Sequence, residues 1–223
     1  KKKFEVKNFG TGFYYSTQER ILLNDLLIKF DSPYAIIFID GLNEFYKEYN
    51  SYQTQFTDLI KYKMNKTSAD DFKDYFLERF NNLNFIRLIK EKIINKKKDL
   101  IKENLNEDEI KKMVNIFKQN QKIIKGVSKE YNLKIVQVLQ PVPIYNDSYQ
   151  SSNIPKEFEI SFENNLRFKK LKKGYEIYLS DFPSYVLNLS DLKIVKPMYI
   201  DGVHYSPDFN LAIAENIMLA FPK

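Results

Sequence analysis

Apolar residues along this chain fall into two patterns, short continuous runs and longer stretches with helical spacing. The clearest run covers residues 34–39, between Pro33 and Gly41. A short run without polar alternation is typical of a strand that is buried on both faces of a parallel sheet. By this pattern and by turn residues at their ends, strands are predicted over 34–39, 134–139 and 185–189. A further short strand is predicted over 4–8, where the chain runs into a Gly-x-Gly turn.

Helical spacing of apolar residues separates the later strands. Ile21, Leu22 and Leu26 predict a helix from Thr17 to Phe30, which Asp31-Ser32-Pro33 ends. Further helices are predicted over 69–98, from Asn104 or Asn106 to about 127, near 161–173 and from Pro207 to about Ala220. Strands separated by helices imply a parallel sheet covered on both faces. The predicted fold is therefore a three-layer α/β/α domain with a mostly parallel sheet.

The stretch from 46 to 130 is polar, charged and rich in aromatic residues, and it follows the strand at 34–39. We interpret it as a helical insertion or lid within a single domain over 1–223. Its aromatic residues have two interpretations. They line an acyl or glycan pocket, or they form the insertion's own core, which is the commoner use of aromatic residues at helical spacing.

Composition excludes several classes of protein. Hydrophobic residues make up 43% of the chain and aromatic residues 15%, which argues for a folded domain and against disorder. No apolar run is long enough to span a bilayer, and no signal peptide is visible. The absence of cysteine excludes disulfides and thiolate chemistry, and with a single histidine we expect no zinc site. We expect no cofactor.

The net charge of +6 admits two interpretations. Basic clusters at 1–3, 96–98 and 169–173 suit an anionic partner such as a nucleic acid, an acidic glycan or a lipid surface. Alternatively they are solvated helix faces. Acidic residues are interspersed at nearly the same frequency, 29 against 35 basic residues, which favours solvated faces. We therefore expect no nucleic-acid partner.

The single histidine of the chain, His204, follows Asp201 by three residues, just before the last predicted helix. A Ser-His-Asp hydrolase needs one imidazole as general base and one carboxylate that holds its tautomer. If the chain has a histidine base, it is His204. The alternative is a structural histidine that is hydrogen-bonded to its neighbours.

Two further residues have suitable chemistry for binding an oxyanion. Asn43 follows the strand at 34–39 and the turn at Gly41, at the sheet edge where ligands bind in open α/β folds. Its side-chain amide can donate to a developing oxyanion, or it can merely cap the next segment. Gly12 lies in a Gly-x-Gly turn whose backbone N–H groups offer the same chemistry. The turn lacks the full dinucleotide fingerprint, so a nicotinamide site is rejected.

The Gly-x-Gly turn, the segment with Asn43 and the Asp201–His204 pair follow one another along the chain in an order that resembles the SGNH (GDSL-like) hydrolase family. That family has four sequence blocks, which carry Ser, Gly, Asn and Asp-x-x-His in turn. Residues 8–12 resemble the Gly block, 41–44 the Gly-x-Asn-Asp block with Glu44 in place of Asp, and 201–204 the last block. Residues 134–143 are similar to the family's fourth strand.

The resemblance implies a role for each candidate residue. His204 would be the general base and Asp201 would orient it, while Asn43 and the Gly12 backbone amide would form the oxyanion hole. When the family's Gly block is aligned to this chain by counting back from Gln18, its glycine falls on Phe13, one residue beyond Gly12.

The family's nucleophilic serine lies on a first strand before the Gly block, and no Gly-x-Ser precedes Asn8 here. We therefore expect the serine and its central strand upstream of Lys1, which makes residues 1–223 an N-terminally incomplete domain, inactive alone. Strands 4–8 and 34–39 should not pair directly, because the central strand would lie between them. Ser16 and Ser206, the serines nearest the motifs, are interpreted as a helix-start residue and the N-cap of the last helix.

The implied activity is that of a serine esterase that removes an acyl group from an acylated carbohydrate or lipid through an acyl-enzyme. The substrate would be a small-molecule or glycan acyl ester. An O-acyltransferase is the nearest enzymatic alternative, and a non-catalytic domain that binds an anionic partner is the alternative from another class. A membrane anchor or export signal upstream would fit this interpretation, so the compartment stays open between cell envelope and cytoplasm.

Overall fold

The computed structural model describes residues 5–29, 33–46, 105–145 and 165–221. The chain divides into two compact units, Lys1–Glu48 with Asn106–Lys223 and, separately, Tyr49–Leu105. The second unit is shorter than the insertion predicted over 46–130, and apart from Leu105 it lies outside the described residues, as does the helix predicted over 69–98. The description below therefore concerns the first unit.

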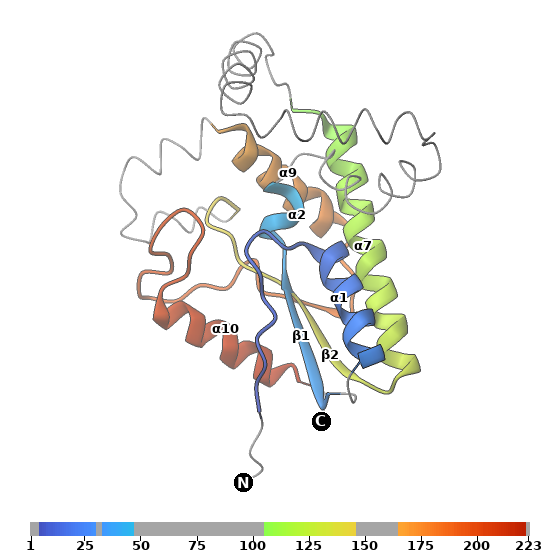
Figure 1. The fold of residues 1–223 in the computed structure, drawn as a ribbon. Coiled ribbons are helices and arrows are strands. Elements are labelled where there is room, and N and C mark those ends of the chain that lie inside the picture. The colour runs from blue at the N-terminus through green and yellow to red at the C-terminus, as the bar shows by residue number, and fades with distance from the viewer. Residues whose placement is uncertain (1–4, 30–32, 47–104, 146–164, 222–223) are drawn as a thin grey trace, which may run out of the picture. The chain divides into compact units, whose positions relative to one another are not determined.

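Three parallel strands form a sheet in the order β1-β2-β3 (Figure 1). Strand β1 covers Ala35–Asp40, β2 covers Lys134–Leu139 and β3 covers Val186–Asn188. In the register Asp40 lies opposite Leu139, so β1 and β2 end together. The α/β class and the parallel strands predicted from the sequence are confirmed.

Helices connect and cover these strands. The helix predicted from Thr17 to Phe30 is confirmed as α1, within one residue at each end, and helix α7 begins after an N-cap at Asn106. The helices of the described residues are α1 (Ser16–Lys29), α2 (Leu42–Tyr46), α7 (Glu107–Glu130), α9 (Leu166–Ser180) and α10 (Pro207–Leu219).

Helices α1 and α7 cover one face of the sheet. Leu23 of α1, Phe38 of β1 and Ile124 of α7 form a buried cluster. In Figure 1, α10 runs on the other side of β1 and β2 from α1 and α7. Helix α7 is therefore a layer on the sheet, although it was predicted within the insertion.

An aromatic cluster fastens the short helix α2 to α7 and α9. The ring of Phe45 lies 5.9 Å from the rings of both Phe117 and Tyr175, in edge-to-face geometry. Gly174 of α9 lies under this ring so closely that a Cβ atom there would be 2.4 Å from Phe45 Cγ. This packing sets the position of α2, which carries Asn43.

The strand predicted over 4–8 is wrong for its described part. Residues 5–8 form no strand, and Val6 is 88% exposed. Among the described residues β1 pairs with β2 alone, so its other edge has no strand beside it. Ile37 and Ile39 of β1 remain 45% and 43% exposed. Residues 5–8 are Glu-Val-Lys-Asn, with a single apolar side chain to bury, and a strand also needs partners for its backbone N–H and C=O groups.

Candidate functional site

The candidate base lies on a loop that closes on itself. Tyr199 and Tyr205 form an isolated antiparallel bridge, and the Ile200 N–H donates to the His204 carbonyl at 2.9 Å. The Ser206 N–H donates to the Met198 carbonyl at 2.8 Å. These bonds hold the intervening residues, including Asp201, in a tight turn.

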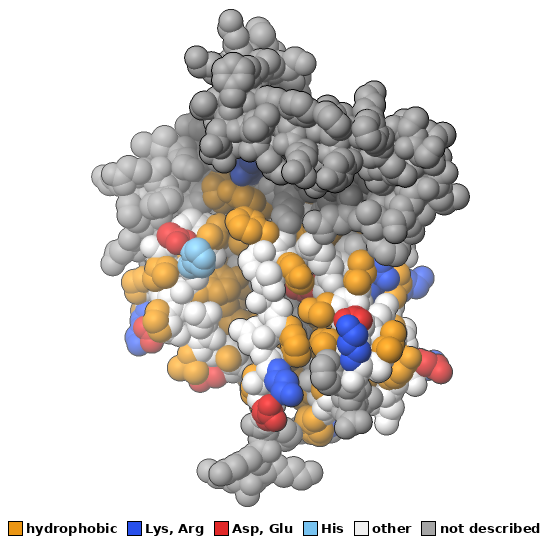
Figure 2. Space-filling view, viewed as in Figure 1, with side chains coloured by type: hydrophobic (Ala, Val, Ile, Leu, Met, Phe, Trp, Pro, Cys, Tyr) orange, Lys and Arg blue, Asp and Glu red, His pale blue; other side chains and the backbone are white. Residues whose placement is uncertain are grey.

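Asp201 and His204 are in direct contact within this turn. The Asp201 Oδ2 atom lies 2.6 Å from His204 Nδ1. The other carboxylate oxygen, Oδ1, accepts from the backbone N–H groups of Val203 and His204, each at 2.8 Å. Since both oxygens are engaged, the carboxylate has a defined orientation. The His204 side chain is 70% exposed, and it is the pale blue side chain in Figure 2.

The Asp201 carboxylate is stabilised in its ionised form by the hydrogen bonds that it accepts. Burial acts to raise the pKa of Asp201, but hydrogen bonds from the Val203 N–H, the His204 ring and the His204 N–H outweigh it and lower the pKa. An ionised carboxylate can only accept a hydrogen bond, so in the neutral ring the hydrogen lies on Nδ1 and the lone pair on Nε2. A ring in this tautomer is suited to act as a general base.

The loop is tied to the sheet and to α10. The buried Tyr205 hydroxyl donates to the Pro141 carbonyl at 2.7 Å, two residues beyond the end of β2. Ser206 caps α10, accepting from the Phe209 N–H at 3.2 Å, and its own hydroxyl donates to the Pro197 carbonyl at 2.6 Å. The predicted N-cap is confirmed. The loop is thus anchored at the carboxyl end of β2.

Asn43 lies in α2, three residues after the end of β1. Its Nδ2 atom donates to the Tyr14 carbonyl at 2.8 Å. An amide nitrogen carries two protons, so one such bond leaves a second proton for another acceptor. Gly41, which separates α2 from β1, has φ of +139°, a conformation that side chains rarely adopt. The turn at Gly41 therefore positions the backbone of Asn43, and the bond to the Tyr14 carbonyl orients its side-chain amide.

Gly12 lies in the turn before α1 and is exposed, with no atom near the position of a Cβ. The Tyr14 N–H donates to the Thr11 carbonyl at 3.1 Å, and Phe13 has φ of +67°. A positive φ at the third residue is the mark of a type II turn, which normally has glycine there. The position that normally takes glycine in such a turn is therefore Phe13, one residue after Gly12.

The two serines nearest the motifs are both committed to structure. Ser16 is fully buried at the start of α1, where its hydroxyl donates to Glu44 Oε2 at 3.1 Å and accepts from Asn120 Nδ2 at 3.0 Å. Ser206 is the cap described above. Within the described residues, no hydrogen bond joins the His204 ring to a serine. The structure brings Asp201 and His204 together, but none of the serines that it describes is hydrogen-bonded to that ring.

Three acidic residues near the carboxyl end of β1, namely Glu19, Asp40 and Glu44, interact with one another. Burial raises the pKa of Asp40 well above its ordinary value, and the charges of Glu19 and Glu44 raise it further. Burial also raises the pKa of Glu19, which a hydrogen bond to Asp40 opposes. Glu19 and Asp40 therefore hold a proton to higher pH than free carboxyls do. The signal in the sequence was an aspartate ending an otherwise apolar strand.

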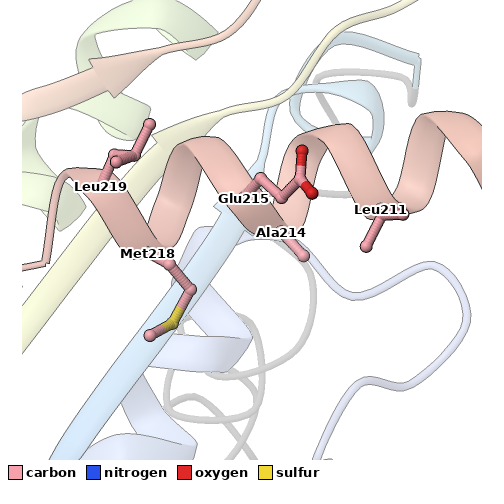
Figure 3. A pocket seen from close by; sticks show the side chains of 5 residues that line it. All are labelled: Leu211, Ala214, Glu215, Met218 and Leu219. Carbon is pink, nitrogen blue, oxygen red and sulfur yellow. The ribbon is translucent and has the colours of Figure 1, made fainter.

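An open pocket of about 550 Å³ lies on α10 and is separate from these residues. Figure 3 shows Leu211, Ala214 and Met218 pointing to one side of the helix. Glu215 and Leu219 complete the lining. Glu215 is the one ionisable residue of this lining, and none of the five residues is a nucleophile. The pocket is therefore not a candidate site for acyl transfer.

No family model, curated protein or solved structure matches this chain. Within the described ranges, no group of three or more His, Cys, Asp or Glu side chains is arranged to hold a metal ion. In the same residues, no helix combines the length and apolar character needed to cross a membrane.

Proposed function

We propose that this protein is a serine acyl hydrolase of the SGNH type, with a flavodoxin-like α/β/α fold and an acylated carbohydrate or lipid as substrate. The observation that carries the proposal is the 2.6 Å contact between Asp201 Oδ2 and His204 Nδ1. It supplies an oriented, exposed imidazole whose Nε2 is free to take a proton from a serine. Asn43 and the backbone amides at Gly12 and Phe13 would bind the oxyanion.

The nucleophilic serine would come from a segment outside the described residues. Within the described residues β1 pairs with a strand on one side only, so its other edge can accept the strand that the proposal requires. A strand along that edge would end beside Asn43, because parallel strands in one sheet finish at the same side. The mechanism is then the usual one for such enzymes. The serine oxygen attacks the ester carbonyl while His204 takes the serine proton. His204 then gives this proton to the departing alcohol as the ester C–O bond breaks, which leaves an acyl-enzyme. Water, deprotonated by His204, attacks the acyl-enzyme and releases the carboxylic acid and the free serine.

A fluorophosphonate probe and a p-nitrophenyl ester test the proposal on the full-length protein. Wild type should be labelled on one serine and should hydrolyse the ester. Asp201→Asn should lower kcat by roughly 10⁴-fold, because the ring then takes the wrong tautomer. His204→Ala should abolish turnover while the fold is kept, since the His204 side chain is mostly exposed.

Asp208→Asn is the matched control. Asp208 is an exposed aspartate on α10 that pairs with Lys196 at 2.8 Å, and its loss should leave turnover unchanged. Absence of both labelling and hydrolysis in wild type would reject the hydrolase and favour a non-catalytic binding domain. Labelling with acyl transfer to an alcohol in preference to water would identify an O-acyltransferase.

A further inference from the structure

Glu44 connects the helix that carries Asn43 to the start of another helix. Its side chain is fully buried, and its Oε1 accepts from the backbone N–H of Ser16, the first residue of α1. Its Oε2 accepts from the Ser16 hydroxyl at 3.1 Å. Both carboxylate oxygens of an α2 residue are thus bonded to one residue that lies 28 positions earlier.

The neighbouring residue makes a parallel connection. Asn43 donates to the Tyr14 carbonyl at 2.8 Å, so consecutive residues of α2 hold Tyr14 and Ser16. Asn120 of α7 reinforces the second connection, because its Nδ2 donates to both the Ser16 and Thr17 hydroxyl oxygens, at 3.0 and 2.8 Å. The turn at residues 11–14 therefore has its end fixed to α2 at two adjacent points.

We propose that Glu44 is a positioning residue that fixes the distance between the Asn43 amide and the backbone amides of the 11–14 turn. This inference rests on the proposed function, in which those groups are the two halves of one oxyanion hole. Glu44 itself would touch neither substrate nor oxyanion. It would act through Ser16 by holding the start of α1, and with it the turn, against α2.

The surroundings of Glu44 argue against a role in stability alone. Burying a carboxylate is unfavourable unless it is well bonded, and an apolar pair is often as stable. Here two further acids, Asp40 and Glu19, lie nearby and make a buried negative charge less favourable still. The start of α1 offsets this in part, since a carboxylate is favoured at a helix N-terminus. A carboxyl group kept fully buried beside two other acidic residues is better explained by the geometry that its two bonds to Ser16 impose.

Glu44→Gln tests the idea with little change in volume. The amide keeps one accepting oxygen and replaces the other with an NH₂ group, which cannot accept from the Ser16 hydroxyl. Glu215→Gln makes the same chemical change at an exposed position of α10 and is the matched control. Ser16→Ala removes the same hydroxyl bond from the other side.

Hydrogen exchange followed by mass spectrometry measures the anchoring without any substrate. In Glu44→Gln, the amides of residues 11–17 should exchange at least about 10-fold faster than in wild type. Peptides from β2 and α7 should be unchanged, and Glu215→Gln should match wild type throughout. Unchanged protection at 11–17 would overturn the proposal. Faster exchange across the whole sheet would also overturn it, because Glu44 would then be a general structural residue.

Ester hydrolysis supplies the second measurement. A displacement of about 1 Å in catalytic groups can reduce a rate by about 100-fold, so kcat should fall by roughly 10- to 100-fold in Glu44→Gln while KM changes little. Glu44→Asp keeps the charge and should recover part of kcat. The double variant with Ser16→Ala should lose no more than the stronger single one, since both changes break the same connection.

An increase in KM with unchanged kcat, or strictly additive effects, would contradict positioning through Ser16. If wild type hydrolyses no ester, the proposed function fails. The exchange measurement still decides whether Glu44 anchors the turn, so the two failures are distinguishable.

Discussion

Gly41→Ala should be severely destabilising, because two independent features of the structure exclude a side chain at this position. Gly41 has φ of +139°, in a region that is nearly closed to other residues. A Cβ atom there would also lie 2.1 Å from the Tyr175 hydroxyl oxygen and 3.0 Å from its Cζ atom. Neither problem can be solved by a small rotation, since Tyr175 is fully buried.

The magnitude follows from these two contributions. Holding a non-glycine residue in such a conformation costs about 1–3 kcal/mol. Displacing the Tyr175 hydroxyl breaks its 2.8 Å bond to the Gln140 carbonyl, and a buried polar group left unpaired costs about 1–3 kcal/mol. The free energy of unfolding should therefore fall by about 2–6 kcal/mol, a large part of the roughly 5–15 kcal/mol that is typical of folded domains.

Thermal unfolding of the full chain, followed by circular dichroism, measures this loss. For a chain of this length, 1 kcal/mol shifts Tm by about 2–4 °C, so Gly41→Ala should lower Tm on the order of 10 °C. Gly126→Ala is the matched control, because Gly126 lies in α7 with nothing near its Cβ position. That variant should raise stability by about 0.5–1 kcal/mol.

Tyr175→Phe separates the two contributions. It removes the hydroxyl that the new Cβ would strike, so the double variant should lose less than the sum of the single variants. A Gly41→Ala protein that melts within about 2 °C of wild type, with Gly126→Ala behaving as expected, would refute the reasoning. Strict additivity in the double variant would show that the hydroxyl contact contributes nothing.

Two further predictions concern the residues that surround α2. Asp40→Asn should change the dependence of stability on pH. Because the pKa of Asp40 is raised in the folded state, its stabilising contribution is complete below the unfolded value of about 3.9 and is lost as pH rises through the raised folded pKa. The Tm of the variant should therefore rise relative to that of wild type as pH increases above the unfolded value of about 3.9. Equal dependence of Tm on pH in the two proteins would contradict this. Gly174→Ala should be less stable than Gly126→Ala, because overpacking against Phe45 costs about 1–3 kcal/mol and the gain in helix propensity is only about 1 kcal/mol. The urea concentrations at the midpoint of unfolding, compared at equal m-value, measure this difference. Identical midpoints would show that the Phe45 ring moves aside without cost.

The sequence was a sufficient guide wherever neighbouring residues decide the outcome. The strand at 134–139 was predicted without error in its bounds, and α1 and α10 were predicted within one residue at each end. The contact of Asp201 with His204 is equally local, since the two residues lie three positions apart in one tight turn. Ser206 was predicted as an N-cap for the same reason, because the cap and its Phe209 N–H are three residues apart.

Tertiary structure alone decided which residues meet across the chain. The bond from Asn43 to Tyr14 and those from Ser16 to Glu44 join segments 28 or 29 residues apart, and Asn120 reaches Ser16 across 104 residues. No periodicity or spacing encodes such contacts, because they depend on how α1, α2 and α7 pack on the sheet. The pairing of Glu19 with Asp40 belongs to the same class.

The strand wrongly predicted over 4–8 has the same physical origin. By itself the sequence determined where apolar runs, helix caps and turns lie, since those depend on the few residues around each position. Whether a short segment becomes a strand depends on whether its N–H and C=O groups find partners, which are supplied from elsewhere in the chain. Residues 134–139 find them in β1 and β3, whereas residues 5–8 find none among the described residues.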